Sequence, residues 1–184
     1  MLIPVVGMDP SLRNWGLSEA QLDLTTGCLT TPLLSLVSVK DLKGKQVRQN
    51  STDLHIAEQL AAAALAAARK AKCVFVEVPV GSQSARAMAS YGICVGVLGA
   101  IRAEGIPLIE VTPTEVKQVF TGNKNATKEE MIAKAIEFYP EANFPTHQGK
   151  ISSKAEHVAD ATAAIHAGVR TSVFQNLMRL YAKV

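Results

Sequence analysis

The chain has 184 residues and a mass of 19.6 kDa, the size of one globular domain, and a hydrophobic share of 48% against 19% charged excludes a disordered chain. Its net charge of +3 permits a polyanionic partner without requiring one. Three cysteines without paired spacing exclude a disulfide framework and predict reduced thiols in a cytoplasmic or nuclear protein, and no apolar run is long enough to cross a bilayer.

The N-terminal part of the chain predicts antiparallel strands. Residues 2–9 form a continuous apolar run that ends in the carboxylate of Asp9, as expected for a central strand covered on both faces. Two further extended stretches, 15–24 and 29–39, are separated by a Thr-Thr-Gly turn. We therefore expect a three-stranded meander, followed by an exposed basic loop at 41–50. The basic side chains of this loop are Lys43, Lys45 and Arg48.

A crossover connection follows the basic loop. From a cap at Ser51 or Thr52, apolar residues recur at helical spacing for about twenty positions, which corresponds to a helix of roughly 30 Å. The apolar stretch 73–78 then predicts a second buried strand. Because such crossovers are right-handed and join parallel strands, we expect Asp9 and Glu77 at the same edge of the sheet.

The C-terminal half predicts mostly helices. Residues 82–104 form a helix rich in Gly and Ala, and residues 106–111 form the last strand. Capping boxes at Thr112 and Thr127 predict two short helices. A polar loop at 144–153 precedes a final helix that continues from there onward.

Acidic side chains gather where these elements are expected to meet. In the final helix His157 and Asp160 lie three residues apart and share a face, with Glu156 beside them. Alone, Asp9 is explained as a turn cap, Glu77 as a solvent-facing strand end, and the helical pair as an exposed ion pair. Carboxylates gathered in a cleft repel one another and usually need cations between them, and oxygen ligands suit Mg²⁺ or Mn²⁺. The combination therefore predicts a divalent-metal site.

Four motifs follow one another along the chain. They are Gly7-Met8-Asp9-Pro10-Ser11 with Asn14 and Gly16, Val76-Glu77-Val78-Pro79, Val116-Lys117-Gln118-Val119 with Gly122 and Lys128, and His157-Val158-Ala159-Asp160-Ala161. In this order and spacing they resemble the RuvC Holliday junction resolvases of the RNase H-like superfamily, over about residues 3–168. The first motif also begins sugar kinases and actin-like ATPases, so the resemblance depends on all four together.

The resemblance implies an α/β fold of the RNase H-like type: a mixed five-stranded sheet, three strands antiparallel and the others parallel, flanked by helices in one domain over residues 1–184. It implies a homodimer that makes paired nicks in four-way DNA junctions by two-metal hydrolysis, with two Mg²⁺ per active site and Mn²⁺ as a substitute. Asp9, Glu77 and Asp160 match the acids of the family, and His157 matches a position where members carry Asp or His. Asp9 is then expected to bridge the two ions.

Two lysines and one apolar residue complete this comparison. Lys117 and Lys128 match basic residues that the family uses on DNA phosphates near the cut, although solvated lysines on helix faces are the plainer interpretation. Val80 stands where some members carry an aromatic wedge, which puts the wedge and any cleavage-sequence preference in question. Further basic residues are candidates for contacts to the DNA backbone. Among them are Arg13, Arg86, Lys150 and Lys154.

Three other functions stay open at this point. The chain is alternatively a nuclease of the same superfamily that acts on structured RNA or RNA–DNA hybrids. An ATP-using actin-like or sugar-kinase fold is a second alternative, although such folds need two lobes and a longer chain. A catalytically silent junction-binding protein is the third. The residues also leave open the preferred branched substrate, a branch-migration helicase as partner, and a cellular or viral origin.

Overall fold

Strand β1 (Leu2–Asp9) lies at the centre of a five-stranded sheet in the computed structural model, which describes residues 1–40, 42, 44 and 48–181. The order in the sheet is β3-β2-β1-β4-β5. The other strands are β2 (Asn14–Asp23), β3 (Leu33–Ser38), β4 (Cys73–Glu77) and β5 (Leu108–Val111). Strands β1, β2 and β3 pair antiparallel, whereas β4 and β5 run parallel to β1. This mixed sheet confirms the predicted fold class.

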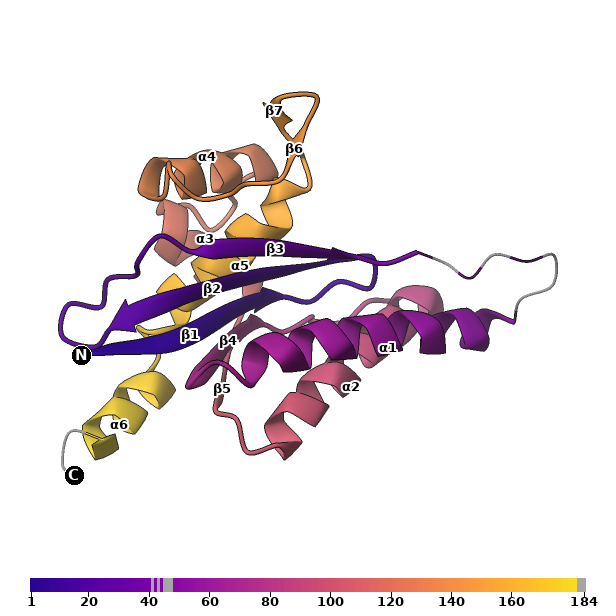
Figure 1. Ribbon diagram of the computed structural model, residues 1–184, viewed down its shortest axis with the longest axis horizontal. Helices are drawn as coiled ribbons and strands as arrows, with labels where there is room; N and C mark the ends of the chain where they lie inside the picture. The colour runs from indigo at the N-terminus through magenta and orange to yellow at the C-terminus, as the bar shows by residue number, and fades with distance from the viewer. Residues whose placement is uncertain (41, 43, 45–47, 182–184) are drawn as a thin grey trace.

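Helices cover both faces of the sheet (Figure 1). Because side chains alternate along a strand, Val6 faces one side, where helices α1 (Gln49–Ala68) and α2 (Ala85–Ala103) pack against it. Val5 faces the other side, which α5 (Ala155–Gly168) covers. Burial on both faces explains why β1 and β4 are apolar along nearly their whole length.

The remaining elements surround α5 (Figure 1). Helices α3 (Pro113–Thr121) and α4 (Lys128–Phe138) pack against it, and α6 (Ser172–Tyr181) follows it at the C-terminal end. A small hairpin of β6 (Thr146–His147) and β7 (Lys150–Ile151) precedes it. Within the described ranges, none of the helices is both long and apolar enough to cross a membrane.

The two predicted capping boxes begin α3 and α4. Thr112 accepts a hydrogen bond from the backbone N–H of Glu115, whose carboxylate accepts one from the backbone N–H of Thr112 at 2.8 Å. Thr127 and Glu130 repeat this arrangement at the start of α4. Each box satisfies N–H groups that the first helical turn leaves without partners, so both helices start where the sequence predicts.

Glycines allow α5 to lie directly on the sheet. A Cβ atom at Gly7 would stand 1.9 Å from the carbonyl oxygen of Ala161, and one at Gly16 would stand 2.0 Å from that of His157. Further along the helix, a Cβ at Gly168 would meet the ring of Phe75 at 2.1 Å. No side chain fits at these three positions, so the glycines set the close distance between α5 and the strands.

Two segments near the C-terminus differ from the sequence prediction. The expected polar loop contains the β6–β7 hairpin, whose strands are too short to show a two-residue period and whose turn has positive φ at Gln148 and Gly149. The final helix is two helices. Thr171 separates them, because its Oγ1 donates to the carbonyl of Gly168 at 2.7 Å and accepts from the N–H of Phe174 at 3.2 Å.

Smaller differences concern element ends. Helix α1 begins at Gln49 after Arg48 and has no side-chain cap, so the predicted cap at Ser51 or Thr52 is wrong. Strand β3 begins at Leu33 rather than residue 29, because the preceding segment bonds to β2 mainly through Thr30. Lys43 and Lys45 of the basic loop lie outside the described residues.

The three cysteines are unpaired. Cys73 lies in the core beneath α5, and Cys94 lies on α2 and faces the core that α1 and α2 form with the sheet. Cys28 is exposed in the turn after β2.

Candidate active site

Two carboxylates end adjacent parallel strands. Asp9 closes β1 and Glu77 closes β4, and the register pairs Met8 with Val76, so the two acids are neighbours across the strands. Phe75, two residues before Glu77, belongs to the core beneath α5. Alternation therefore directs both carboxylates to the face of the sheet on which α5 lies.

Helix α5 adds His157 and Asp160 from its first two turns. The His157 ring contacts Asp9 directly, with 2.6 Å between Nδ1 and Oδ2. Gly16 makes this contact possible, because it pairs with Asp9 in the sheet and lets the His157 backbone lie against β2. The structure thus brings together the strand ends and the late helix that the sequence singled out.

The carboxyl groups lie close enough to influence one another's ionisation. Burial raises the pKa of Glu77 to about 7, and the charge of Asp9 contributes to the rise while Lys117 opposes it. The pKa of Asp160 rises to about 8, mainly because of burial. The charges of Asp9, Glu77 and Glu156 raise it further, and Lys117 again acts in the opposite direction. A cation at this point would relieve the repulsion among the carboxylates.

The donor set fits a hard divalent cation. Its oxygens come from Asp9, Glu77 and Asp160, and one imidazole completes it, which suits Mg²⁺ or Mn²⁺. The Oδ1 atom of Asp160 is buried and has no hydrogen-bond partner, an arrangement that costs free energy unless an ion satisfies it. Over residues 1–40, 42, 44 and 48–181, however, no three His, Cys, Asp or Glu side chains already stand as a ligand set. The direct contact of His157 with Asp9 occupies atoms that would face an ion.

The two lysines differ in their surroundings. Lys117 of α3 is partly buried and acts electrostatically on both Glu77 and Asp160. Lys128 begins α4, and its Nζ lies 2.7 Å from Oε1 of Glu156, a contact that raises the pKa of Lys128. The structure therefore brings Lys117 to the carboxylates and Lys128 to the acidic residue beside His157.

A cleft of about 500 Å³ opens over this site. Asp9, Glu77 and His157 form part of its wall, whereas Asp160 does not line it. Other lining residues come from the start of α2 and the loop after β1, and the polar ones among them are Ser11, Arg13, Arg86, Ser90 and Tyr91. The guanidinium of Arg86 is held by the Asp53 carboxylate at 2.6 and 2.7 Å. Arginines and carboxylates that line one cleft suit a phosphate backbone with metal ions beside it.

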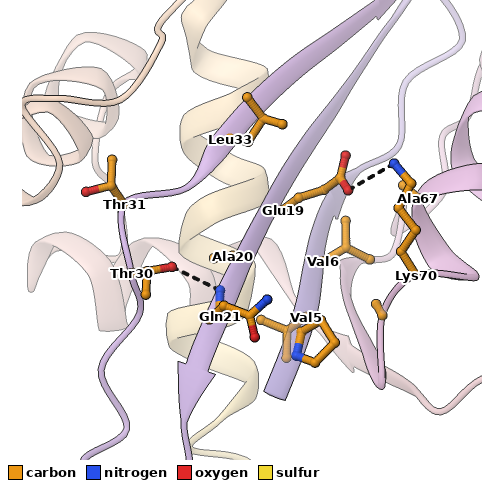
Figure 2. Close-up of a pocket in the computed structure, with 12 residues that line it drawn as sticks. Val5, Val6, Glu19, Ala20, Gln21, Thr30, Thr31, Leu33, Ala67 and Lys70 are labelled. Atoms are coloured by element: carbon orange, nitrogen blue, oxygen red, sulfur yellow. Dashed lines mark hydrogen bonds and ion pairs between the residues drawn. The ribbon is translucent and has the colours of Figure 1, made fainter. Parts of the chain in front are cut away.

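A second hollow, of about 410 Å³, lies near the opposite end of the sheet (Figure 2). Residues of β1 and β2 and the end of α1 line it. Its polar contacts are an exposed ion pair of 3.5 Å between Lys70 and Glu19 and the hydrogen bond from the Gln21 N–H to Thr30. We find no cluster of acids or nucleophiles among its lining residues, so this hollow does not compete with the cleft as an active site.

Two further residues, Tyr91 and Glu156, belong to the site although the sequence did not single them out as site residues. Tyr91 occupies a helical position typical of a core residue, yet it lines the cleft. Glu156 contacts both Lys128 and the His157 ring, and its spacing from Asp160 was the only signal of this position in the sequence.

Comparison with known proteins gives matches in structure alone. No protein-family model matches the chain, and no curated protein matches it in sequence. The Thermus thermophilus RuvC in complex with a Holliday junction substrate superposes with a TM-score of 0.65 at 19% identity, covering 95% of this chain and 96% of that one. The chain has the fold of RuvC.

Two further solved structures agree with this result. A second T. thermophilus RuvC structure matches with a TM-score of 0.63 at 20% identity over 96% of each chain. The yeast mitochondrial Holliday junction resolvase Ydc2 matches with a TM-score of 0.56 at 12% identity, covering 96% of this chain and 85% of that one. The predicted resemblance to RuvC is thus confirmed for the whole architecture.

Proposed function

We propose that this chain is a metal-dependent endonuclease that resolves Holliday junctions and other branched DNA by paired nicks. The observation that carries the proposal is the meeting of Asp9, Glu77 and Asp160 with His157 at one sheet edge, in a fold shared with known junction resolvases. Arg13 and Arg86, which line the same cleft as the carboxylates, support a nucleic-acid substrate.

We assign the four residues as ligands of two divalent cations, Mg²⁺ or Mn²⁺. Such a pair supplies an activated water and stabilises the leaving oxygen of a phosphodiester. Asp9 lies between Glu77 on one side and the α5 residues on the other, which supports its assignment as the bridging ligand. Lys117 offsets the negative charge of the acids, and Lys128 is assigned to a phosphate near the cut.

We further propose that the protein acts as a homodimer through α2. Along about 18 Å of this helix, every exposed residue is small or apolar. These residues are Met88, Ala89, Gly92, Val95, Gly96, Gly99 and Ala100. A side chain at Gly92, Gly96 or Gly99 would meet no atom within 4 Å, so a second copy has room to approach closely. Two active sites related by a two-fold axis would account for symmetric cuts.

The test is a cleavage panel with ligand variants. Asp9→Asn and Glu77→Gln keep the side-chain shapes but remove a charged ligand, so we expect junction binding to persist while Mg²⁺-dependent cleavage falls by about 10³-fold or more. Asp23→Asn, which removes a carboxylate at the far end of the sheet, should cleave like the wild type.

The panel contains four-way, three-way, flap and linear duplex DNA, together with an RNA–DNA hybrid and structured RNA. Cutting of the four-way junction in preference to linear duplex supports the proposal. Preferential cutting of the hybrid or of RNA would replace it with the alternative function, and native rates in Asp9→Asn would refute the assignment of the site.

A further inference from the structure

The His157 ring stands between two carboxylates. Its Nδ1 atom lies 2.6 Å from Oδ2 of Asp9, and its Nε2 atom lies 3.7 Å from Oε1 of Glu156. Glu156 is not a random surface acid, because only 15% of its side chain is exposed. The same Oε1 atom accepts the 2.7 Å contact from Lys128. Four side chains thus form one continuous chain from Lys128 to Asp9.

We propose that Glu156 is a positioning residue that holds His157 in the orientation and tautomer required of a metal ligand. The inference rests on the metal site of the proposed function. It adds a residue that neither the sequence motifs nor the ligand assignment includes.

The two nitrogens of an imidazole ligand have different tasks. One nitrogen offers its lone pair to the ion, and the other usually donates its N–H to a carboxylate that fixes the ring. Nδ1 faces Asp9, the carboxylate assigned as the bridge, so Nδ1 is the nitrogen on the metal side. Without an ion, the 2.6 Å contact with the Asp9 carboxylate needs a hydrogen on Nδ1. In the loaded site Nδ1 would give its lone pair to the ion, the ring hydrogen would stand on Nε2, and this N–H would donate to the Glu156 carboxylate.

The remaining distance is small. At 3.7 Å the Nε2–Oε1 contact is longer than a hydrogen bond, so the Glu156 carboxyl group would have to move closer to the ring to accept one. Lys128 competes for that oxygen in the free protein. The Lys128 side chain is 71% exposed, so it is free to exchange Glu156 for a DNA phosphate. Once Lys128 has left, the Glu156 carboxylate interacts with His157 alone. Binding of the DNA substrate would therefore raise the affinity of the site for metal.

The test measures Mn²⁺ binding in the absence of DNA. Electron paramagnetic resonance gives the concentration of free Mn²⁺, and the bound Mn²⁺ follows by difference. We expect Glu156→Ala to weaken Mn²⁺ binding by about 10–100-fold. Glu156→Gln keeps an acceptor oxygen and loses the charge, so its affinity should fall between those of Glu156→Ala and the wild type. The intermediate value separates positioning from general damage to the fold.

Two variants complete the design. Glu129→Ala removes an exposed acid next to Lys128 that does not reach His157, and it should bind Mn²⁺ within twofold of the wild type. Lys128→Met should weaken junction binding while Mn²⁺ binding stays unchanged or tightens. Glu156→Ala should show the opposite split, with weaker Mn²⁺ binding and undiminished junction binding.

Wild-type Mn²⁺ affinity in both Glu156 variants would overturn the inference, as would an equal loss in Glu129→Ala. If the Asp9→Asn variant binds Mn²⁺ as tightly as the wild type, the metal site of the proposed function is wrong instead. The two failures are therefore distinguishable.

Discussion

The pKa of His166 is set by the aromatic cluster in which its ring is buried. Its ring lies among Phe120, Phe138 and Tyr139, and the Tyr139 hydroxyl and Nε2 form a hydrogen bond of 2.7 Å. Burial, with a smaller contribution from Arg170, lowers the pKa of His166 to about 4. The neutral ring is therefore the form that shares the hydrogen bond with Tyr139 and joins the end of α4 to α5.

This lowered pKa predicts a loss of stability in acid. The pKa of His166 is about 6.5 in the unfolded chain and about 4 in the folded protein. At pH values between these two, the unfolded chain binds more protons than the folded protein, so the free energy of unfolding falls as pH falls. The slope from this group reaches at most about 1.4 kcal/mol per pH unit. In His166→Gln, which keeps an acceptor for Tyr139, urea unfolding between pH 4.5 and 7 should show a smaller pH dependence.

His147→Gln, which removes an imidazole from the exposed hairpin, is the matched control. If His166→Gln and the wild type lose stability in parallel over this range, burial of a neutral His166 is not the cause of the acid sensitivity.

At the scale of single residues, the sequence identifies the acids but not their contacts. Asp9, Glu77 and Asp160 stand out because each lies at the end of an apolar segment or within one, where burying an unpaired charge is costly. Glu156 has no such signal, since a glutamate in the first turn of a helix is ordinary. Its contact with the neighbouring His157 ring depends on the conformations of both side chains, which Lys128 of α4 and Asp9 of β1 hold from distant parts of the sequence.

Helix α5 is the element on which the site depends. Two of its backbone carbonyls occupy the space that side chains at Gly7 and Gly16 would take. Ser18 and Thr162 add a buried hydrogen bond of 2.8 Å between strand and helix. These contacts fix the distance between α5 and the sheet, and at this distance His157 contacts Asp9.

A single methyl group should disturb this arrangement. In Gly16→Ala the new Cβ would overlap the His157 carbonyl, so α5 must move away from β2. We expect a loss of about 1–3 kcal/mol in the free energy of unfolding, as for other overpacked cores, together with a large loss of cleavage. Chemical denaturation and the junction assay measure the two effects.

A graded series strengthens this experiment. Gly16→Val should cost more than Gly16→Ala, because its larger side chain needs a larger displacement. An alanine variant with native stability and native cleavage would show that the distance between helix and sheet does not control the site.

Element types follow from the sequence more readily than element contacts. The apolar runs predicted β1 and β4, and the capping boxes predicted the starts of α3 and α4, because these signals are local. The β6–β7 hairpin escaped because two-residue strands have no period. Gly7 and Gly16 belong to the first motif, yet their contact partners, Ala161 and His157, lie about 140 to 155 residues further along the chain.

At the scale of the molecule, the exposed side of α2 is the surface that a second copy would cover. Gly96→Glu places a charge in its middle, and burying an unpaired carboxylate between two copies is costly. Light scattering should therefore give the mass of one chain, 19.6 kDa, for the variant and twice that mass for the wild type.

The cleavage products report the same change. On a supercoiled plasmid with an extruded cruciform, the dimer should yield linear DNA from two coordinated cuts, whereas Gly96→Glu should yield mainly nicked circles. Val173→Glu, a charge at an exposed position of α6, should behave like the wild type. A wild-type mass of 19.6 kDa at working concentration would contradict the dimer.

The unequal exposure of the three thiols allows a dye to be attached at a single cysteine. Burial raises the pKa of Cys73 to about 12 and that of Cys94 to about 11, so neither ionises near neutral pH nor meets the solvent. A maleimide dye added to the native protein therefore attaches at Cys28, which lies roughly 25 Å from Asp9 along the sheet. Fluorescence can follow docking of a labelled oligonucleotide without engineering a cysteine.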